Sequence, residues 1–186
     1  MGYFSTRGLR GSTLEELINR TNKQYFEDDL AVIQKLPTAI KPVELDSERG
    51  VITLAYFDEQ STVDYMGNVQ GIPICFDAKE TGKKNLPIAN IHEHQMTFME
   101  KFIHQGGLSF ILVHFTDYDR YFILDFETLK RYWDEAKAGG RKSIPLDAFD
   151  EELEIFRHKR YLIHYLEGLE IYLMLQEQRS KDIDSH

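Results

Sequence analysis

Two spacings of apolar residues divide the chain into expected helices and strands. Apolar side chains recur every three or four positions where we expect helices, over residues 13–28, 91–104, 126–137 and 161–178. β-Branched and aromatic residues dominate shorter stretches where we expect strands, over residues 31–36, 51–57, 72–79, 108–115 and 121–125. This order predicts an α/β fold in which one central mixed sheet is flanked by helices on both sides.

Cap residues set the expected ends of the helices. Ser12 and Glu15 have the spacing of a capping box, in which each side chain bonds a free backbone amide at the start of the first helix. The glycine pairs at 106–107 and 139–140 are expected to end the second and third helices, because glycine readily adopts the left-handed conformation found there.

Turn residues and polar stretches give the expected connections. Gly67-Asn68 predicts a turn over residues 65–68. The polar stretch 41–50 predicts irregular chain, and we expect a projecting hairpin or stalk between the strands at 31–36 and 51–57. We also expect a mobile loop at 81–85 and a disordered tail at 181–186.

The composition fits one compact domain. At 186 residues, 42% of them hydrophobic, the chain is long enough for a sizeable core, and no linker or repeat divides it. No apolar run reaches the roughly 18 residues that a membrane span needs. The single cysteine, Cys75, excludes an internal disulfide and lies in an apolar strand, where we expect it to be buried. We therefore expect a cytoplasmic protein with no membrane association.

The net charge of −9 at pH 7 argues at first against nucleic acid, because DNA-binding proteins gain affinity by releasing counterions from phosphates. The distribution of the charge weakens that argument. Five acids and no base occupy residues 147–154, whereas basic residues gather in short clusters elsewhere. A metal-dependent nuclease also needs acids to hold its metal. The basic candidates for DNA binding are Arg10, Lys83, Lys84 and Lys142.

One strand ends in residues suited to phosphodiester cleavage. Asp77 and Lys79 lie two residues apart at the end of an apolar strand, so their side chains share one face. Asp64 lies in the preceding segment. Mg²⁺ prefers oxygen ligands and takes only one or two protein carboxylates, so Asp64 and Asp77, with the Ala78 carbonyl, meet its needs. The Lys79 ammonium is then placed to orient a water or to stabilise charge on the phosphate.

Three further polar residues are candidates for the same site. Thr62 precedes Asp64 by two residues and shares its face if this segment is extended. Gln95 lies in the helix that follows the strand, where a polar side chain can cover the site. Glu15, in the first helix, is a further candidate acid. Each of the three is also compatible with ordinary packing or surface.

An acid-x-lysine triplet by itself is weak evidence. Glu135-Ala136-Lys137 repeats it on a polar helix, where residues two apart face different directions and are solvated. Asp77-Ala78-Lys79 differs because it ends an apolar strand, although a simple ion pair there remains an alternative. His92 and His94 lack the spacing of four residues that a helical zinc site requires, so zinc is not expected.

The motifs together resemble the RecU family of Holliday-junction resolvases, within the PD-(D/E)XK nuclease superfamily. The matching pieces follow one another through most of the chain. They are Arg10-Gly11, Thr13-Leu14-Glu15, Asn19, Pro37-Thr38, Ala55-Tyr56-Phe57, Ser61-Thr62-x-Asp64-Tyr65-x-Gly67, Phe76-Asp77-Ala78-Lys79-Glu80-Thr81, His92-Glu93-His94-Gln95, Gly107 with Phe110, and Gly140-x-Lys142-Ser143-Ile144-Pro145. One departure is Asp77, where many relatives have glutamate.

This resemblance implies a restriction-endonuclease-like core over 1–186, with an inserted stalk at about 37–57 that enters the junction centre. It implies a homodimer that uses Mg²⁺, or Mn²⁺ in its place, and makes paired symmetric nicks in a four-way DNA junction. Recombinase or branch-migration proteins are implied as further partners. By motif, the metal residues would be Thr62, Asp64, Asp77 and Gln95, Lys79 would be catalytic, and Tyr56 and Phe57 would stack on bases.

Other functions stay open at this point. A nuclease of the same superfamily with restriction-type or flap specificity would carry the same acids. A junction-binding protein that modulates recombination with little catalysis would retain its activities after Asp77→Asn. A structural Ca²⁺ site would use the acids without any chemistry.

Overall fold

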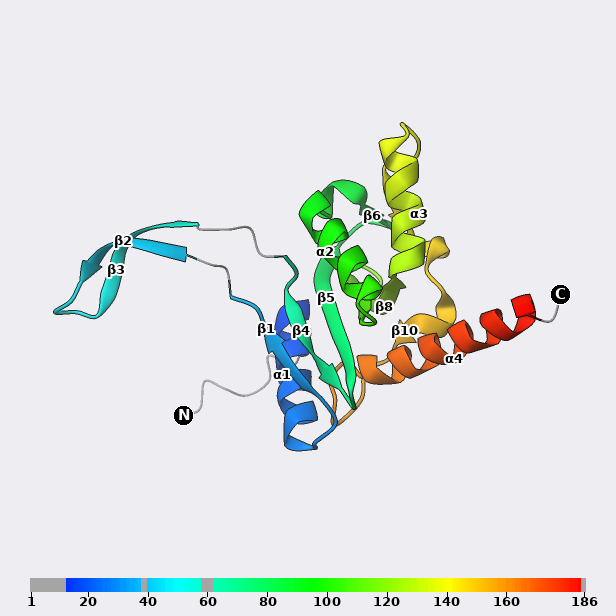
Figure 1. The fold of residues 1–186 in the computed structure, drawn as a ribbon, viewed down its shortest axis with the longest axis horizontal. Helices are drawn as coiled ribbons and strands as arrows, with labels where there is room; N and C mark the ends of the chain where they lie inside the picture. The colour runs from blue at the N-terminus through cyan, green and yellow to red at the C-terminus, as the bar shows by residue number, and fades with distance from the viewer. Residues whose placement is uncertain (1–12, 38–39, 58–61, 185–186) are drawn as a thin grey trace.

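A six-stranded mixed sheet forms the centre of the computed structural model, which describes residues 13–37, 40–57 and 62–184 (Figure 1). Its strands, in spatial order, are β1 (Val32–Lys35), β4 (Tyr65–Val69), β5 (Ile72–Thr81), β7 (Leu108–Phe115), β8 (Arg120–Asp125) and β10 (Glu154–Ile155). The β5–β7 pair is parallel and the other pairs of this sheet are antiparallel. The expected mixed sheet flanked by helices is confirmed.

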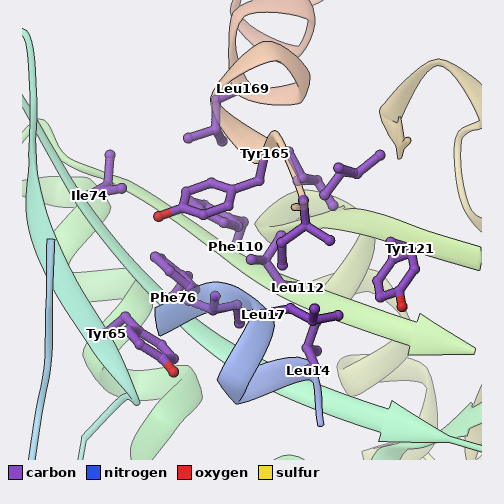
Figure 2. Close-up of a cluster of buried hydrophobic side chains, with 14 of the residues drawn as sticks. Leu14, Leu17, Tyr65, Ile74, Phe76, Phe110, Leu112, Tyr121, Tyr165 and Leu169 are labelled. Atoms are coloured by element: carbon purple, nitrogen blue, oxygen red, sulfur yellow. The ribbon is translucent and has the colours of Figure 1, made fainter. Parts of the chain in front are cut away.

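Helices cover both faces of this sheet. α1 (Leu14–Glu27) and the start of α4 (Tyr165–Asp184) pack on one face, and α2 (Glu93–His104) and α3 (Phe126–Lys137) pack on the other. Figure 2 shows the first cluster, in which residues of α1 and α4 enclose Phe76 and Phe110. Cys75 lies between Ile74 and Phe76 of this cluster, and its side chain faces the opposite side of the sheet. There it is buried in the second cluster, against α2 and α3, as expected.

Smaller elements complete the sheet's surroundings. β6 (Asn85–Pro87) pairs with β9 (Ser143–Pro145) in a separate two-stranded sheet. Short 3₁₀ helices lie at Ile88–Asn90, Leu146–Ala148 and Glu151–Leu153. Within the part of the chain that the structure describes, none of the helices has the length and apolar character needed to cross a membrane.

The helix ends follow the expected chemistry with one shift. Thr13 caps α1, its Oγ1 accepting from the Glu16 amide at 3.4 Å. The cap is therefore one residue later than the predicted Ser12, which lies outside the described residues. Gly106 and Gly139 have φ of 85° and 88° just beyond α2 and α3, which confirms the predicted glycine stops.

The predicted turn at 65–68 is wrong. These residues belong to β4, and the chain reverses instead at Gln70 and Gly71, with φ of 50° and 95°. Gly67 lies inside β4 because the backbone of β1 passes directly over it: a Cβ there would lie 2.2 Å from the Val32 carbonyl oxygen. The glycine thus serves close strand packing rather than a turn.

The projecting hairpin is a two-stranded ribbon of its own, formed by β2 (Ile40–Asp46) and β3 (Val51–Phe57), which extends away from the main sheet (Figure 1). The irregular chain predicted at 41–50 is therefore wrong for residues 41–46. β2 tolerates Pro42 because the ribbon has free edges and its register shifts between Pro42 and Glu44. Several large apolar side chains of the ribbon are exposed, namely Ile40, Val43, Leu45, Val51, Ile52, Leu54 and Tyr56.

The last helix begins and ends later than predicted. Residues 161–164 form an irregular segment that packs against α1, where the Ile163 amide donates to Thr21 Oγ1 at 3.3 Å. α4 then runs to Asp184, so the prediction of a disordered tail is wrong for 181–184. The predicted loop at 81–85 is shorter, because Thr81 ends β5 and Asn85 begins β6.

Replacing Gly67 with alanine should destabilise the sheet strongly. The added Cβ would meet backbone atoms of β1, including Ile33 Cα at 2.7 Å, and a backbone cannot rotate away as a side chain can. We expect a loss of about 2–4 kcal/mol in unfolding free energy, measured by urea denaturation. Gly82→Ala is the control, because its nearest neighbour would be the Asp117 side chain at 3.1 Å. Equal effects of the two substitutions would contradict this explanation.

Candidate active site

The β4–β5 hairpin brings the two predicted acids together. Asp77 lies on β5 with no exposed surface, and Asp64 lies just before β4, 13 residues earlier. The Asp64 amide donates to Asp77 Oδ1 at 3.2 Å, and the Ala78 amide donates to Asp64 Oδ2 at 2.9 Å. Each carboxylate is therefore held by the backbone of the other segment.

The hairpin also leaves one edge of β5 open beside these acids. β4 pairs with β5 only as far as Tyr65 and Phe76, so within the described ranges no strand pairs with the next part of β5 on that side. Asp64 fills the gap by accepting the Ala78 amide. Because the N–H and C=O of one strand residue point to the same side, the Ala78 carbonyl faces this edge as well.

Lys79 and Gln95 contact the buried carboxylate of Asp77. Lys79 forms an ion pair with Asp77 Oδ2 and has a side chain only 17% exposed. The Gln95 Nε2 donates to the same Asp77 oxygen at 3.1 Å. The Gln95 Oε1 accepts from the His92 amide at 3.0 Å, so the Gln95 oxygen caps α2 and its nitrogen faces the acid.

Burial raises the pKa of Asp77 to about 7. The neighbouring Asp64 carboxylate adds to the increase, whereas the Lys79 ammonium opposes it. A carboxylate in this position is costly to ionise without a further cation nearby. The site is therefore an acid pair whose negative charge is incompletely balanced by the protein itself.

The donor set fits a hard divalent cation. Among the described residues there is no group of three His, Cys, Asp or Glu side chains that could hold a metal. Mg²⁺ usually keeps several waters and takes one or two carboxylates. The Asp64–Asp77 pair and the Ala78 carbonyl match that requirement, and a cation there would also compensate the buried charge.

The other predicted site residues lie at different distances from this centre. Thr62 is half-buried in the segment that leads to Asp64. Glu15 is on α1, where its carboxylate forms an ion pair with Lys35. The Glu15 backbone oxygen is 3.5 Å from the hydroxyl of Tyr65, the residue that follows Asp64 in the chain. The roles of Thr62, Gln95 and Glu15 stay predictions.

The predicted DNA-binding residues that the structure describes lie on different elements. Lys83 and Lys84 are exposed in the turn after β5, and Lys142 is exposed just before β9. Tyr56 is 64% exposed on the distant ribbon. Arg10 and the side chain of Phe57 lie outside the described part of the structure.

Sequence reasoning missed the partnership of His92 with Gln95. His92 is the N-cap residue of α2: the Gln95 Oε1 accepts from its amide at 3.0 Å, and the Gln95 amide donates to its backbone carbonyl at 3.1 Å. The spacing of three residues, typical of a capping box, was the available signal.

A large cavity lies away from these acids. It has a volume of about 720 Å³ and is lined by α4 and by residues near the start of β5, including Ile72 and Ile74. None of the candidate site residues lines it. This cavity is therefore separate from the cluster of Asp64, Asp77 and Lys79.

Comparisons with known proteins point to one family. The model of the family described as recombination protein U, RecU, matches residues 9–171. A relative from Oceanobacillus iheyensis is 41% identical over 172 residues, covering 90% of this chain and 86% of the relative. One from Oenococcus oeni is 45% identical over 142 residues, covering 74% and 72%. Both relatives are named Holliday junction resolvase RecU.

Proposed function

The chain belongs to the RecU family, and on that premise we propose that it is a DNA endonuclease that resolves four-way junctions. The observation that carries the proposal is the cluster of Asp64, Asp77 and Lys79 on the open edge of β5. The names of its relatives supply the substrate class, since both are called Holliday junction resolvases.

We propose Mg²⁺ as the cofactor, with Mn²⁺ as a substitute. Asp64, Asp77 and the Ala78 carbonyl would hold the ion, with Thr62 and Gln95 contributing through water. A bound Mg²⁺ would screen the phosphate charge, lower the pKa of a bound water and stabilise the leaving oxygen.

Lys79 is the proposed catalytic cation of the protein itself. Its ammonium is already beside Asp77 and largely shielded from solvent, so little reorganisation is needed when a phosphate arrives. It would orient the attacking water or stabilise the charge that develops on the scissile phosphate. Glu15 is proposed as a further acid on the α1 side.

The DNA contacts are proposed to come from two regions. The ribbon would be the stalk, within about 37–57, that enters the junction centre, where Tyr56 and Phe57 stack on unpaired bases. The exposure of Tyr56 supports this proposal. Arg10, Lys83, Lys84 and Lys142 would contact phosphates, which gives binding a strong salt dependence.

Paired nicks require two active sites, so we propose a homodimer. An isolated two-stranded ribbon is only marginally stable in water, and the exposed apolar side chains of this one support contacts with DNA or with a second copy. We further propose that residues 1–186 form one nuclease domain, that the protein works in the cytoplasm, and that recombinase or branch-migration proteins are its partners.

The test is cleavage of a synthetic mobile four-way junction at pH 8, with Mg²⁺ or EDTA, and with linear duplex and flap DNA as controls. We expect paired symmetric nicks in the junction strands only with the metal present. Binding without cutting would favour the non-catalytic alternative. Equal cutting of duplex or flap DNA would support the assignment as a nuclease but contradict the proposed specificity for junctions.

A further inference from the structure

The residue after the catalytic lysine faces the opposite side of β5. Strand side chains alternate, so Glu80 points toward α1 while Asp77 and Lys79 face α2. The Glu80 Oε1 accepts from the Leu14 amide at 3.0 Å. Leu14 is the first residue of α1, and its amide is one of the donors that a helix cannot satisfy internally. The contact therefore ties the first turn of α1 to the active-site strand.

A buried histidine holds the same carboxylate from the neighbouring strand. His114 is the register partner of Glu80 in the parallel β5–β7 pair. Its Nδ1 is 3.1 Å from Glu80 Oε1 and must donate, because a carboxylate oxygen only accepts. The ring is 7% exposed and stacks on Tyr121 with centroids 4.0 Å apart. Its Nε2 has no hydrogen-bond partner among the described residues, although it lies 3.6 Å from Asp119 Oδ1.

A buried tyrosine, Tyr65, connects α1 to the segments that carry Asp64 and Asp77. The Tyr65 hydroxyl donates to Asn19 Oδ1 on α1 at 3.0 Å. Tyr65 directly follows Asp64, and its ring stacks on Phe76, which directly precedes Asp77, with centroids 4.8 Å apart. Figure 2 shows Tyr65 and Phe76 lying against Leu17 of α1. The position of α1 is thus transmitted to the backbone beside both acids.

We propose that Glu80 and His114 are positioning residues for the cleavage reaction. They clamp the first turn of α1 to the rear of β5, and α1, through Tyr65, holds Asp64 against Asp77. Neither residue touches the substrate. The inference rests on the proposed nuclease function, because a clamp behind the acids has a catalytic effect only if the acids are catalytic.

The test compares Glu80→Ala with Glu80→Gln, which keeps an oxygen for the Leu14 amide, and with His114→Phe, which keeps the ring stack but lacks the donor. Glu127→Ala is the matched control, because Glu127 is an exposed acid in the first turn of α3. Amide hydrogen exchange of metal-free protein reports the first turn of α1. Steady-state cleavage of the four-way junction with Mg²⁺ gives kcat and KM.

We expect Glu80→Ala to speed exchange at the α1 first turn by about tenfold. Its kcat should fall by about tenfold with KM within about twofold, because misplaced acids slow the reaction without removing a DNA contact. His114→Phe should show a smaller change of the same kind, and Glu80→Gln should stay close to wild type.

Three outcomes would overturn the inference. Unchanged exchange in Glu80→Ala would mean that no clamp exists. Faster exchange with a kcat no lower than that of Glu127→Ala would make the contact purely structural. A raised KM at unchanged kcat would make Glu80 a DNA contact. If the wild type cuts no junction, the proposed function fails, and the exchange measurement still decides whether the clamp exists.

Discussion

Asp77→Asn is expected to abolish junction cleavage and to make the metal-free protein more stable at pH 8. Asparagine fits the same space but lacks the charge that holds a cation, so turnover should fall by at least about a thousandfold. Whereas turnover falls, the unfolding free energy of the metal-free protein should rise. The folded state binds a proton on Asp77 more tightly than the unfolded chain does, because burial raises this pKa from 3.8 to about 7.

The associated stability is fully present below about pH 4 and is lost as the pH rises through about 7. Asparagine removes that loss. We expect the unfolding free energy of the variant to exceed that of the wild type by about 1–3 kcal/mol at pH 8 and to equal it at pH 4. Urea denaturation in EDTA at the two pH values measures this difference in stability. A single-turnover cleavage assay measures the loss of activity. Asp117→Asn, at an exposed aspartate, is the control and should change neither quantity. A variant destabilised at pH 8 would contradict this description of the site.

Lys79→Met is expected to lose activity and stability together. Turnover should fall by about 10²–10³-fold, because the ammonium that we propose faces the phosphate is gone. The metal-free protein should lose about 2 kcal/mol or more at pH 8, because Asp77 is left buried without its ion-pair partner. This loss should shrink as the pH falls below 7, where Asp77 takes up a proton.

The control for this prediction is Lys79→Arg. Arginine keeps the charge, so stability should largely return, but the planar guanidinium cannot replace a compact ammonium and activity should return only in part. Junction binding in Ca²⁺ should survive in both variants. If Lys79→Met cleaves within about fivefold of wild type, Lys79 is only half of a strand-end ion pair, and its proposed catalytic role is wrong.

Local patterns predicted the strands and helices that bury their apolar faces. α3 matches its predicted range of 126–137, because a helical repeat, a capping aspartate at Asp125 and a glycine stop all agree. Gly67-Asn68 misled the prediction because two turn signals lie close together, and only the approach of β1 shows that Gln70-Gly71 makes the turn. Local chemistry cannot rank such signals when packing by a distant strand decides between them.

In the candidate site, too, local patterns predicted some features, and contacts between distant residues decided the others. Alternation along one strand was enough to predict that Asp77 and Lys79 share a face, and their ion pair confirms it. The role of Gln95 oxygen as a helix cap could not be predicted, because it depends on where α2 begins. Contacts between residues far apart in the chain, such as Glu80 with Leu14 at a separation of 66 residues, leave no local pattern at all.

The unequal neighbours of β5 have a consequence for how the site assembles. Its antiparallel partner β4 is joined by a tight turn, so Asp64 and Asp77 can meet within a hairpin, which forms in about microseconds. Its parallel partner β7 comes only after the chain has passed through α2, which makes that contact slower to form. We therefore expect the acids to approach each other in water, where charge is tolerated, before the later elements bury them. Folding in the presence of a divalent cation should relieve the repulsion of the acids at that late step.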